Sequence, residues 1–322
     1  MISSANQVAG PRPQGGPLIT VAICTRNRSA FLEPAMRSVL AQIHDDTELL
    51  VVDNVSTDGT ADLVRQLAAT SANVRYVYEA KTGLSTARNT AILQARGAYV
   101  IFLDDDATVE PGWLAAYQAF FRSPPSPRIA VAGGAVYPRY QTPPPRWLSA
   151  KENKYDLGSE AFCFPRQASP WECNSAYARE IAIEQGLFDA RLGHNGTSVG
   201  AHEGADFTLR LQEAGYEIWW LPGAVIQHTI HASRVNLSWY CRSAFAAGAA
   251  SALKRLKFAS GPGQRLTLRL GRIAAAPFQC LLNGLVFLVL FPLGRQAVAV
   301  NSLRRALRSA GYAWQSFKPL AK

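Results

Sequence analysis

Three consecutive aspartates, Asp104, Asp105 and Asp106, are the residues of this chain whose types and spacing point most directly to chemistry. They follow the short apolar run Tyr99–Leu103, and a run bounded in this way predicts a buried strand. Adjacent carboxylates repel one another, and a divalent cation, which prefers oxygen ligands, would relieve that repulsion. The aspartates therefore predict a metal site at the carboxyl end of a strand, with a solvated acidic turn as the alternative.

Alternating strands and helices must position these aspartates. Apolar runs at Leu18–Cys24, Glu48–Asp53 and Asn73–Glu79 alternate with helix-like stretches, the third of which is Leu84–Ala95. This alternation predicts βαβ units and a largely parallel sheet flanked by helices. The polar residues after each strand would then meet at one edge of the sheet, where open α/β sheets bind nucleotides.

Further elements are expected after the aspartates. A helix should run to about Arg122, and the segment rich in proline and aromatic residues from Tyr140 to Pro170 should form loops. The remaining expected elements are a helix at about 205–214 and strands at Ile129–Tyr137, Glu217–Leu221 and Ala224–His228.

Composition divides the chain into three parts. Residues 1–17 resemble a flexible tail, residues 18–235 carry the strand and helix pattern, and residues 236–322 form a basic helical region. This last region has 13 Lys or Arg and no Asp or Glu, whereas the rest of the chain has 20 basic and 23 acidic residues. Such a block fits either a nucleic acid or an anionic membrane surface as partner.

An apolar segment inside the basic region favours the membrane. Residues 273–294 carry no charge, and as a helix they would be about 33 Å long, enough to cross a bilayer. Pro277, Asn283 and Pro292 weaken a single straight span, so an interfacial, re-entrant or buried helix stays open. The basic flanks suit the anionic cytoplasmic leaflet, and we expect membrane contact and no nucleic acid.

The five cysteines indicate a reducing compartment. Their number is odd and no two of them form a CxxC pair, which argues against a disulfide framework or a zinc site.

Four segments together resemble the family-2 glycosyltransferases. They are VAICTRNR, VVDNVSTDGT, the stretch from Gly83 to Leu114, and HEGADFTLRLQEAGY followed by GAVIQH, in the expected order over residues 18–234. The resemblance is to bacterial enzymes that build exopolysaccharides or other cell-surface glycans. It implies the nucleotide-sugar-binding fold called GT-A and an inverting enzyme dependent on Mn²⁺ or Mg²⁺. The implied donor is a UDP-sugar, and the implied acceptor is a lipid-linked or growing glycan.

The resemblance also assigns residues to the nucleotide. Asp53, at the end of the second strand, would hydrogen-bond a uracil-type base. Arg88 offers the geometry for a phosphate, although an ion pair with the aspartates is an equally ordinary role. The residues that the resemblance places around the base, ribose and diphosphate are Thr25, Arg26, Asp53, Gly83, Arg88, Asn89, Asp104 and Asp105.

The aspartates align with the DxD motif of this family. Asp104 and Asp106 would bind the metal, which stabilises the charge that develops on a departing nucleoside diphosphate. His228 matches a histidine that completes this site, and an imidazole ligand favours Mn²⁺ over Mg²⁺. His231 is a competitor for that role, and a histidine without a ligand role is the alternative.

The catalytic base is less well defined. Inverting transfer needs a carboxylate that accepts the proton of the acceptor hydroxyl. Family members show an acidic pair before an arginine, here Arg210, but this chain has Glu203 followed by Gly204, where the base would stand. The base is then Glu203 or Asp206, unless Glu203 only caps the helix. With no base, the chain would be a nucleotide- or glycan-binding module.

Three further residues match a segment near the donor sugar and the acceptor: Trp171, Glu172 and Asn174. Trp171 would stack on a sugar ring or belong to the core. Processive members carry a QxxRW motif, but Gln141 lies too far from Arg146 and Trp147, which favours single addition. A sugar-nucleotide pyrophosphorylase would need a phosphate loop rich in glycine and lysine, which CTRNR is not.

Overall fold

The structure is a computed structural model that describes residues 17–44, 46–149, 151–192, 203–257, 259 and 261–318. The tail predicted at residues 1–17 lies outside this part of the chain except for Pro17. The chain divides into two compact units. The first contains residues 17–138, 154–192 and 203–229, and the second contains residues 139–153 and 230–318. Composition did not indicate that residues 139–153 group with the C-terminal helices.

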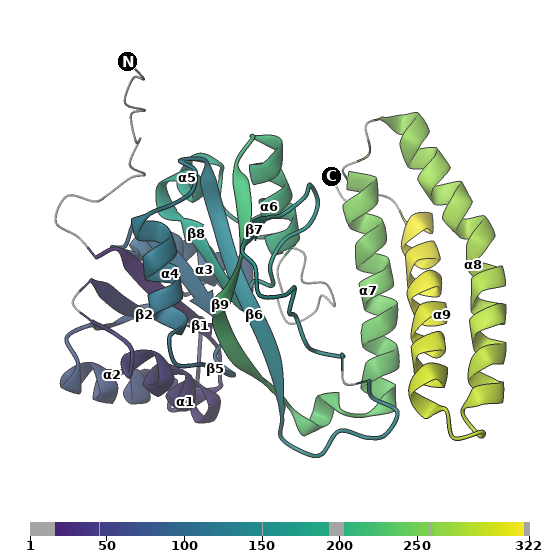
Figure 1. Cartoon of the computed structure of the whole chain (residues 1–322), viewed down its shortest axis with the longest axis horizontal. Helices are drawn as coiled ribbons and strands as arrows, with labels where there is room; N and C mark the ends of the chain where they lie inside the picture. Colours follow the sequence, from purple (N-terminus) through teal and green to yellow (C-terminus); the bar gives the residue numbers. More distant parts are fainter. Residues whose placement is uncertain are drawn as a thin grey trace. The chain divides into compact units, whose positions relative to one another are not determined.

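A parallel half of the sheet forms the first part of the chain. Its strands lie in the order β3-β2-β1-β4, and each neighbouring pair is parallel, as predicted. Figure 1 shows the helices that connect them. The strands are β1 (Ile19–Thr25), β2 (Thr47–Asp53), β3 (Val74–Tyr78) and β4 (Tyr99–Leu103), and the helices are α1 (Ser29–Leu40), α2 (Thr60–Thr70) and α3 (Leu84–Gln94).

The rest of the sheet departs from the parallel pattern. After β4 the order continues β8-β6-β9-β5, and the described pairings of β8 with β4 and with β6 and of β9 with β5 are antiparallel. The short strand β7 (Phe162–Cys163) pairs with β9 off this path. The strands are β5 (Ala107–Val109), β6 (Ile129–Tyr140), β8 (Asn174–Ala178) and β9 (Glu217–Ile230).

One strand, β9, replaces two that the sequence predicted. The expected gap between Leu221 and Ala224 does not occur, and Pro222 lies within β9 between the stretches that pair with β7 and with β5. Neither pairing therefore loses a ladder hydrogen bond to the missing N–H of proline.

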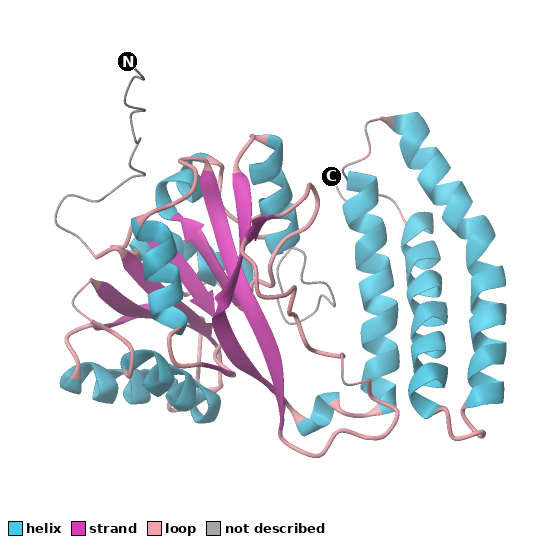
Figure 2. Cartoon of the chain, in the orientation of Figure 1, coloured by secondary structure: helices cyan, strands magenta, loops and turns pink. Residues whose placement is uncertain are grey.

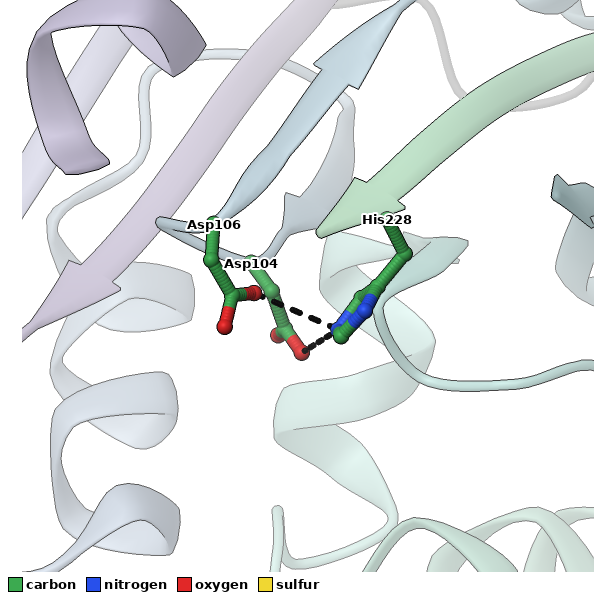
Figure 3. Close-up of side chains that lie close together, drawn as sticks. All are labelled: Asp104, Asp106 and His228. Carbon is green, nitrogen blue, oxygen red and sulfur yellow. Dashed lines mark ion pairs between the residues drawn. The ribbon is translucent and has the colours of Figure 1, made fainter. Parts of the chain in front are cut away.

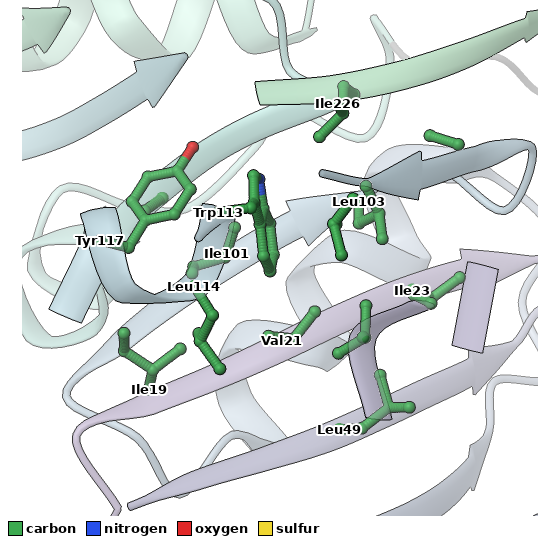
Figure 4. Packing of buried hydrophobic residues seen from close by; sticks show 14 of the residues in the cluster. Ile19, Val21, Ile23, Leu49, Ile101, Leu103, Trp113, Leu114, Tyr117 and Ile226 are labelled. Atoms are coloured by element: carbon green, nitrogen blue, oxygen red, sulfur yellow. The ribbon is translucent and has the colours of Figure 1, made fainter. Parts of the chain in front are cut away.

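Helices cover both faces of the sheet. Side chains of a strand alternate between faces, so Val21 and Ile23 join one core while Ala22 joins the other. The first core also takes side chains from α1, α2 and α4 (Trp113–Arg122), and Figure 4 shows Trp113 among them. The second core takes side chains from α3, α5 (Arg179–Glu184) and α6 (Glu203–Glu213). The result is the three-layer α/β architecture that the sequence predicted.

The second unit contains three long helices, drawn in cyan in Figure 2: α7 (Leu237–Lys257), α8 (Pro262–Leu290) and α9 (Gln296–Phe317), preceded by the short turn η1 (Ala232–Arg234). The central helix is α9, which packs against both α7 and α8. A Cβ on Gly311 of α9 would lie 2.0 Å from the carbonyl oxygen of Phe245 on α7, so only glycine permits this approach.

The helix α8 contains most of the predicted apolar segment. It continues through Pro277, and by length and composition it is the one helix among the described residues that could cross a membrane. Many of its large apolar side chains are exposed, among them Phe278, Leu281 and Leu288.

Candidate functional site

The predicted nucleotide and metal residues gather at the carboxyl edge of the parallel strands. Thr25 ends β1, Asp53 ends β2, and the three aspartates lie between β4 and β5. This is the edge where α/β sheets place their ligands, which makes it the candidate site of this chain.

Asp104, Asp106 and His228 form a cluster that could hold a metal ion. Each offers one ligand atom, and these atoms all lie within 4.8 Å of one another (Figure 3). The His228 Nε2 lies 3.2 Å from Asp106 Oδ1 and 3.6 Å from Asp104 Oδ2. Two carboxylates and an imidazole fit Mn²⁺ or Mg²⁺, with the nitrogen ligand better suited to Mn²⁺.

Strand pairing brings the histidine to the aspartates. His228 of β9 lies opposite Ala107, the residue that follows Asp106, in the antiparallel pairing with β5. The backbone N–H of Thr229 also donates to the carbonyl oxygen of Asp106. His231 belongs to the second compact unit and is not a member of the cluster.

Arg28 is a site residue that sequence reasoning missed. Its guanidinium bridges two aspartates, with Nη1 2.9 Å from Asp105 Oδ1 and Nη2 3.0 Å from Asp106 Oδ2. The hydroxyl of Thr25 donates to Asp105 Oδ2 at 2.7 Å. Burial raises the pKa of Asp105 to about 6, although Arg28 and Thr25 act against it. The only sequence signal for Arg28 was its position in the CTRNR segment, and that segment also contains Arg26.

Arg88 links the aspartates to the predicted catalytic region. Its Nη1 lies 2.9 Å from Glu203 Oε1 and its Nη2 lies 3.8 Å from Asp104 Oδ1. Burial would lower the pKa of Arg88, but Glu203 and Asp104 outweigh it, and the pKa rises. Burial would likewise raise the pKa of Asp104, but His228 and Arg88 hold that pKa below its ordinary value. Both groups therefore stay charged.

The two predicted bases are both buried. Glu203 Oε1 accepts from Arg88, while its Oε2 has no hydrogen-bond partner within the described part of the chain. Asp206 Oδ2 accepts from Arg210 Nε at 3.1 Å. Arg210 also donates to the backbone carbonyls of Gln185 and Leu187, so this pair ties α6 to the loop after α5.

Asp53 is buried at the end of β2 and already carries local hydrogen bonds. Its Oδ1 accepts from the backbone N–H of Ser56, and its Oδ2 accepts from the Tyr76 hydroxyl at 2.8 Å. The neighbouring Asn54 accepts from the backbone N–H of Gly83, which begins α3. These bonds join the loops after β2 and β3 beside the aspartates.

Two predicted site asparagines form hydrogen bonds within the protein, and a predicted site arginine is exposed. Arg26 is exposed. The Asn89 amide exchanges two hydrogen bonds with the backbone of Phe188. Asn174 is fully buried, and its amide contacts the side chains of Trp113 and Tyr117 and two backbone carbonyls. The structure gives both asparagines packing roles, and their predicted contacts with ligand remain predictions.

Trp171 and Glu172 lie in the turn before β8. One face of Trp171 stacks on Tyr155, with ring centroids 5.0 Å apart, and 38% of the residue is exposed. Glu172 is half-buried, and burial raises its pKa, with Arg88 lowering it and Glu203 raising it further. The Glu172 carboxylate also lies against the backbone of Gly204 at the start of α6.

Comparisons with known proteins agree with this architecture. The profile of glycosyl transferase family 2 matches residues 20–185. TuaG of Bacillus subtilis, named for teichuronic acid biosynthesis, is 40% identical over 91 residues, which are 28% of this chain and 36% of that protein. The succinoglycan biosynthesis protein ExoM of Rhizobium meliloti is 25% identical over 71% of this chain and 72% of its own. The pre-mycofactocin glycosyltransferase of Mycobacterium tuberculosis is 30% identical over 76% of this chain and 50% of its own.

Solved structures share the fold. The mannosyltransferase PcManGT of Pyrobaculum calidifontis, determined with GDP-Man and Mn²⁺, aligns with a TM-score of 0.57 and 21% identity over 93% of this chain and 88% of its own. GalNAc-T7, determined with UDP, GalNAc and Mn²⁺, aligns with a TM-score of 0.53 and 17% identity over 77% of this chain and 52% of its own.

Proposed function

We propose that this chain, which belongs to glycosyl transferase family 2, is an inverting, metal-dependent glycosyltransferase. It transfers a sugar from a nucleotide sugar, a UDP-sugar, to a lipid-linked or growing glycan. The observation that carries this proposal is the cluster of Asp104, Asp106 and His228 at the carboxyl edge of the sheet. PcManGT, which shares the fold, was determined with a nucleotide sugar and Mn²⁺.

The cluster would hold the metal, Mn²⁺ or Mg²⁺. A divalent cation there supplies charge stabilisation for the diphosphate leaving group. The protein contributes the ligands and their surroundings. Arg28 offsets part of the charge of Asp105 and Asp106, and Arg88, which also pairs with Glu203, offsets part of the charge of Asp104. Two arginines face four carboxylates, so a net negative charge remains that a divalent cation would balance.

The donor would lie along the same edge. We expect Asp53 to receive the nucleobase, and Thr25, Arg26 and Gly83 to contact the ribose and diphosphate. Arg88 is buried and already paired with Glu203, which favours a role in positioning carboxylates over direct contact with a phosphate.

Inversion follows from a single displacement. The acceptor oxygen attacks the anomeric carbon from the face opposite the diphosphate, and a carboxylate accepts its proton. Three carboxylates compete for this role, the predicted Glu203 and Asp206 and, from the turn before β8, Glu172. The lack of a QxxRW motif supports one addition per binding event rather than processive polymerisation.

The membrane part of the proposal rests on the second unit. The exposed apolar side chains of α8 and the basic residues around it suit an anionic cytoplasmic leaflet. We assign the protein to the cytoplasmic face of a bacterial membrane, where lipid-linked acceptors are found.

A second candidate function is a nucleotide- or glycan-binding module that has lost catalysis. The observation that favours it is Gly204, which stands where the family carries its base. Turnover of a nucleotide-sugar panel by the purified chain separates the two. One donor consumed with Mn²⁺ and spared with chelator supports the transferase, and a donor bound without turnover supports the module.

A further inference from the structure

Gly204 and Glu172 occupy complementary positions. A Cβ built on Gly204 would lie 1.9 Å from Glu172 Oε1 and 2.1 Å from Glu172 Cγ. Side-chain carbons do not approach other atoms this closely, so any residue larger than glycine at position 204 would displace Glu172. The Glu172 side chain thus lies where a side chain at the start of α6 would begin.

The two carboxylates of α6 have other partners. Glu203 is 2% exposed and forms an ion pair with Arg88, and Asp206 is 3% exposed and forms one with Arg210. Glu203 balances the charge of the buried Arg88, and Asp206 holds Arg210, which anchors the loop after α5. A proton taken up by either carboxylate would weaken its ion pair. These roles keep each carboxylate in its ion pair, whereas a general base exchanges a proton in every cycle.

Glu172 has the surroundings that the other two lack. It is half-buried, and 38% of its neighbour Trp171 is exposed to solvent. The pKa of Glu172 is raised by burial and by the charge of Glu203, which moves a carboxylate toward the range useful for accepting a proton near neutral pH. Arg88 lies close enough to act on all three acids, Glu203, Asp104 and Glu172.

We propose that Glu172 is the general base of this enzyme and replaces the carboxylate that is missing at Gly204. The inference rests on the proposed transferase function. In the step, the acceptor hydroxyl oxygen forms a bond to the anomeric carbon while its proton passes to a Glu172 carboxylate oxygen. The bond from that carbon to the nucleoside diphosphate breaks, and the diphosphate leaves with the bonding electrons. Glu203 then acts as a positioning residue that holds Arg88 beside Asp104 and Glu172.

The test compares Glu172→Gln with wild type and with Glu160→Gln, an exposed glutamate of the same segment. We measure kcat for the donor consumed by wild type, donor affinity by calorimetry, and the melting temperature. The proposal expects Glu172→Gln to lower kcat by about 10²- to 10⁴-fold, with donor affinity and melting temperature unchanged and the control fully active. A kcat within threefold of wild type, or an equal loss of donor affinity, would overturn it.

A relocation variant tests the geometric argument. Glu172→Ala opens the space beside α6, and adding Gly204→Asp returns a carboxylate to that place. The double variant should regain at least tenfold in kcat over Glu172→Ala alone. A folded double variant that binds donor without this gain contradicts the replacement. If wild type itself turns over no donor, the transferase function fails and the inference fails with it, whereas an active wild type beside an active Glu172→Gln rejects the base alone.

Discussion

Arg88 and Glu203, which are 115 residues apart in the chain, form an ion pair of 2.9 Å in which neither side chain is more than 5% exposed. Removing one partner leaves the other buried charge without its nearest counter-charge. We expect Glu203→Ala to lower the free energy of unfolding by about 3–5 kcal/mol. Denaturant titration measures this loss.

The matched control for that prediction is the exposed pair of Glu33 and Arg37 on α1, whose side chains are 44% and 63% exposed. Because water screens this pair, Glu33→Ala should cost under about 1 kcal/mol. Equal losses in the two variants would show that the Arg88–Glu203 pair does not organise the site.

His228 should contribute to metal affinity. Its replacement by Ala removes one of three clustered ligands, and we expect the Kd for Mn²⁺ to rise at least tenfold. Calorimetry or paramagnetic resonance of the purified chain measures the affinity without any donor. His231→Ala is the matched control and should bind Mn²⁺ as wild type does. Weaker Mn²⁺ binding by His231→Ala, with unchanged binding by His228→Ala, would assign the ligand role to His231 instead.

The pH profile of kcat/KM should report Glu172. A protonated base is inactive, so activity falls as the pH falls through its pKa. Because burial and Glu203 raise that pKa and Arg88 only partly opposes them, the acidic limb should lie above 4.5, the ordinary value for glutamate. The profile of Glu172→Gln should lose this limb. A limb at or below 4.5, or one that persists in the variant, would contradict the assignment.

Membrane binding should depend on the exposed face of α8. Leu281 and Leu288 are 65% and 66% exposed, and replacing both by Asp removes apolar area that would enter the lipid interface. In flotation with vesicles of anionic phospholipid, the bound fraction of this double variant should fall at least tenfold. Leu93→Asp, on the exposed surface of α3, should bind as wild type; loss in that control as well would point to general misfolding.

Much of the site followed from local sequence pattern. The apolar runs ended at Asp53 and Asp104, and parallel strands bring such ends to one edge whatever the details of packing. The family resemblance of the GAVIQH segment nominated His228. What the pattern did not indicate was that β9 would continue through Pro222 and pair with β5, which is what sets the histidine beside the aspartates.

The remaining features depend on contacts between distant residues. Arg28 reaches Asp105 across 77 positions, and nothing local distinguishes it from Arg26. The relationship of Glu172 to Gly204 is of the same kind, since a glycine in one segment is explained only by a side chain in another. A periodic pattern reports which face a residue occupies, and it does not report which partner lies opposite.

Metal-dependent transfer is measured as sugar release from a UDP-sugar panel by wild type and by Asp106→Asn, each with Mn²⁺ and with chelator. We expect turnover of one donor by wild type with Mn²⁺, loss of that turnover on chelation, and at least a hundredfold lower rate in Asp106→Asn with Mn²⁺ restored. Equal turnover with chelator, or an Asp106→Asn variant as active as wild type, would contradict it.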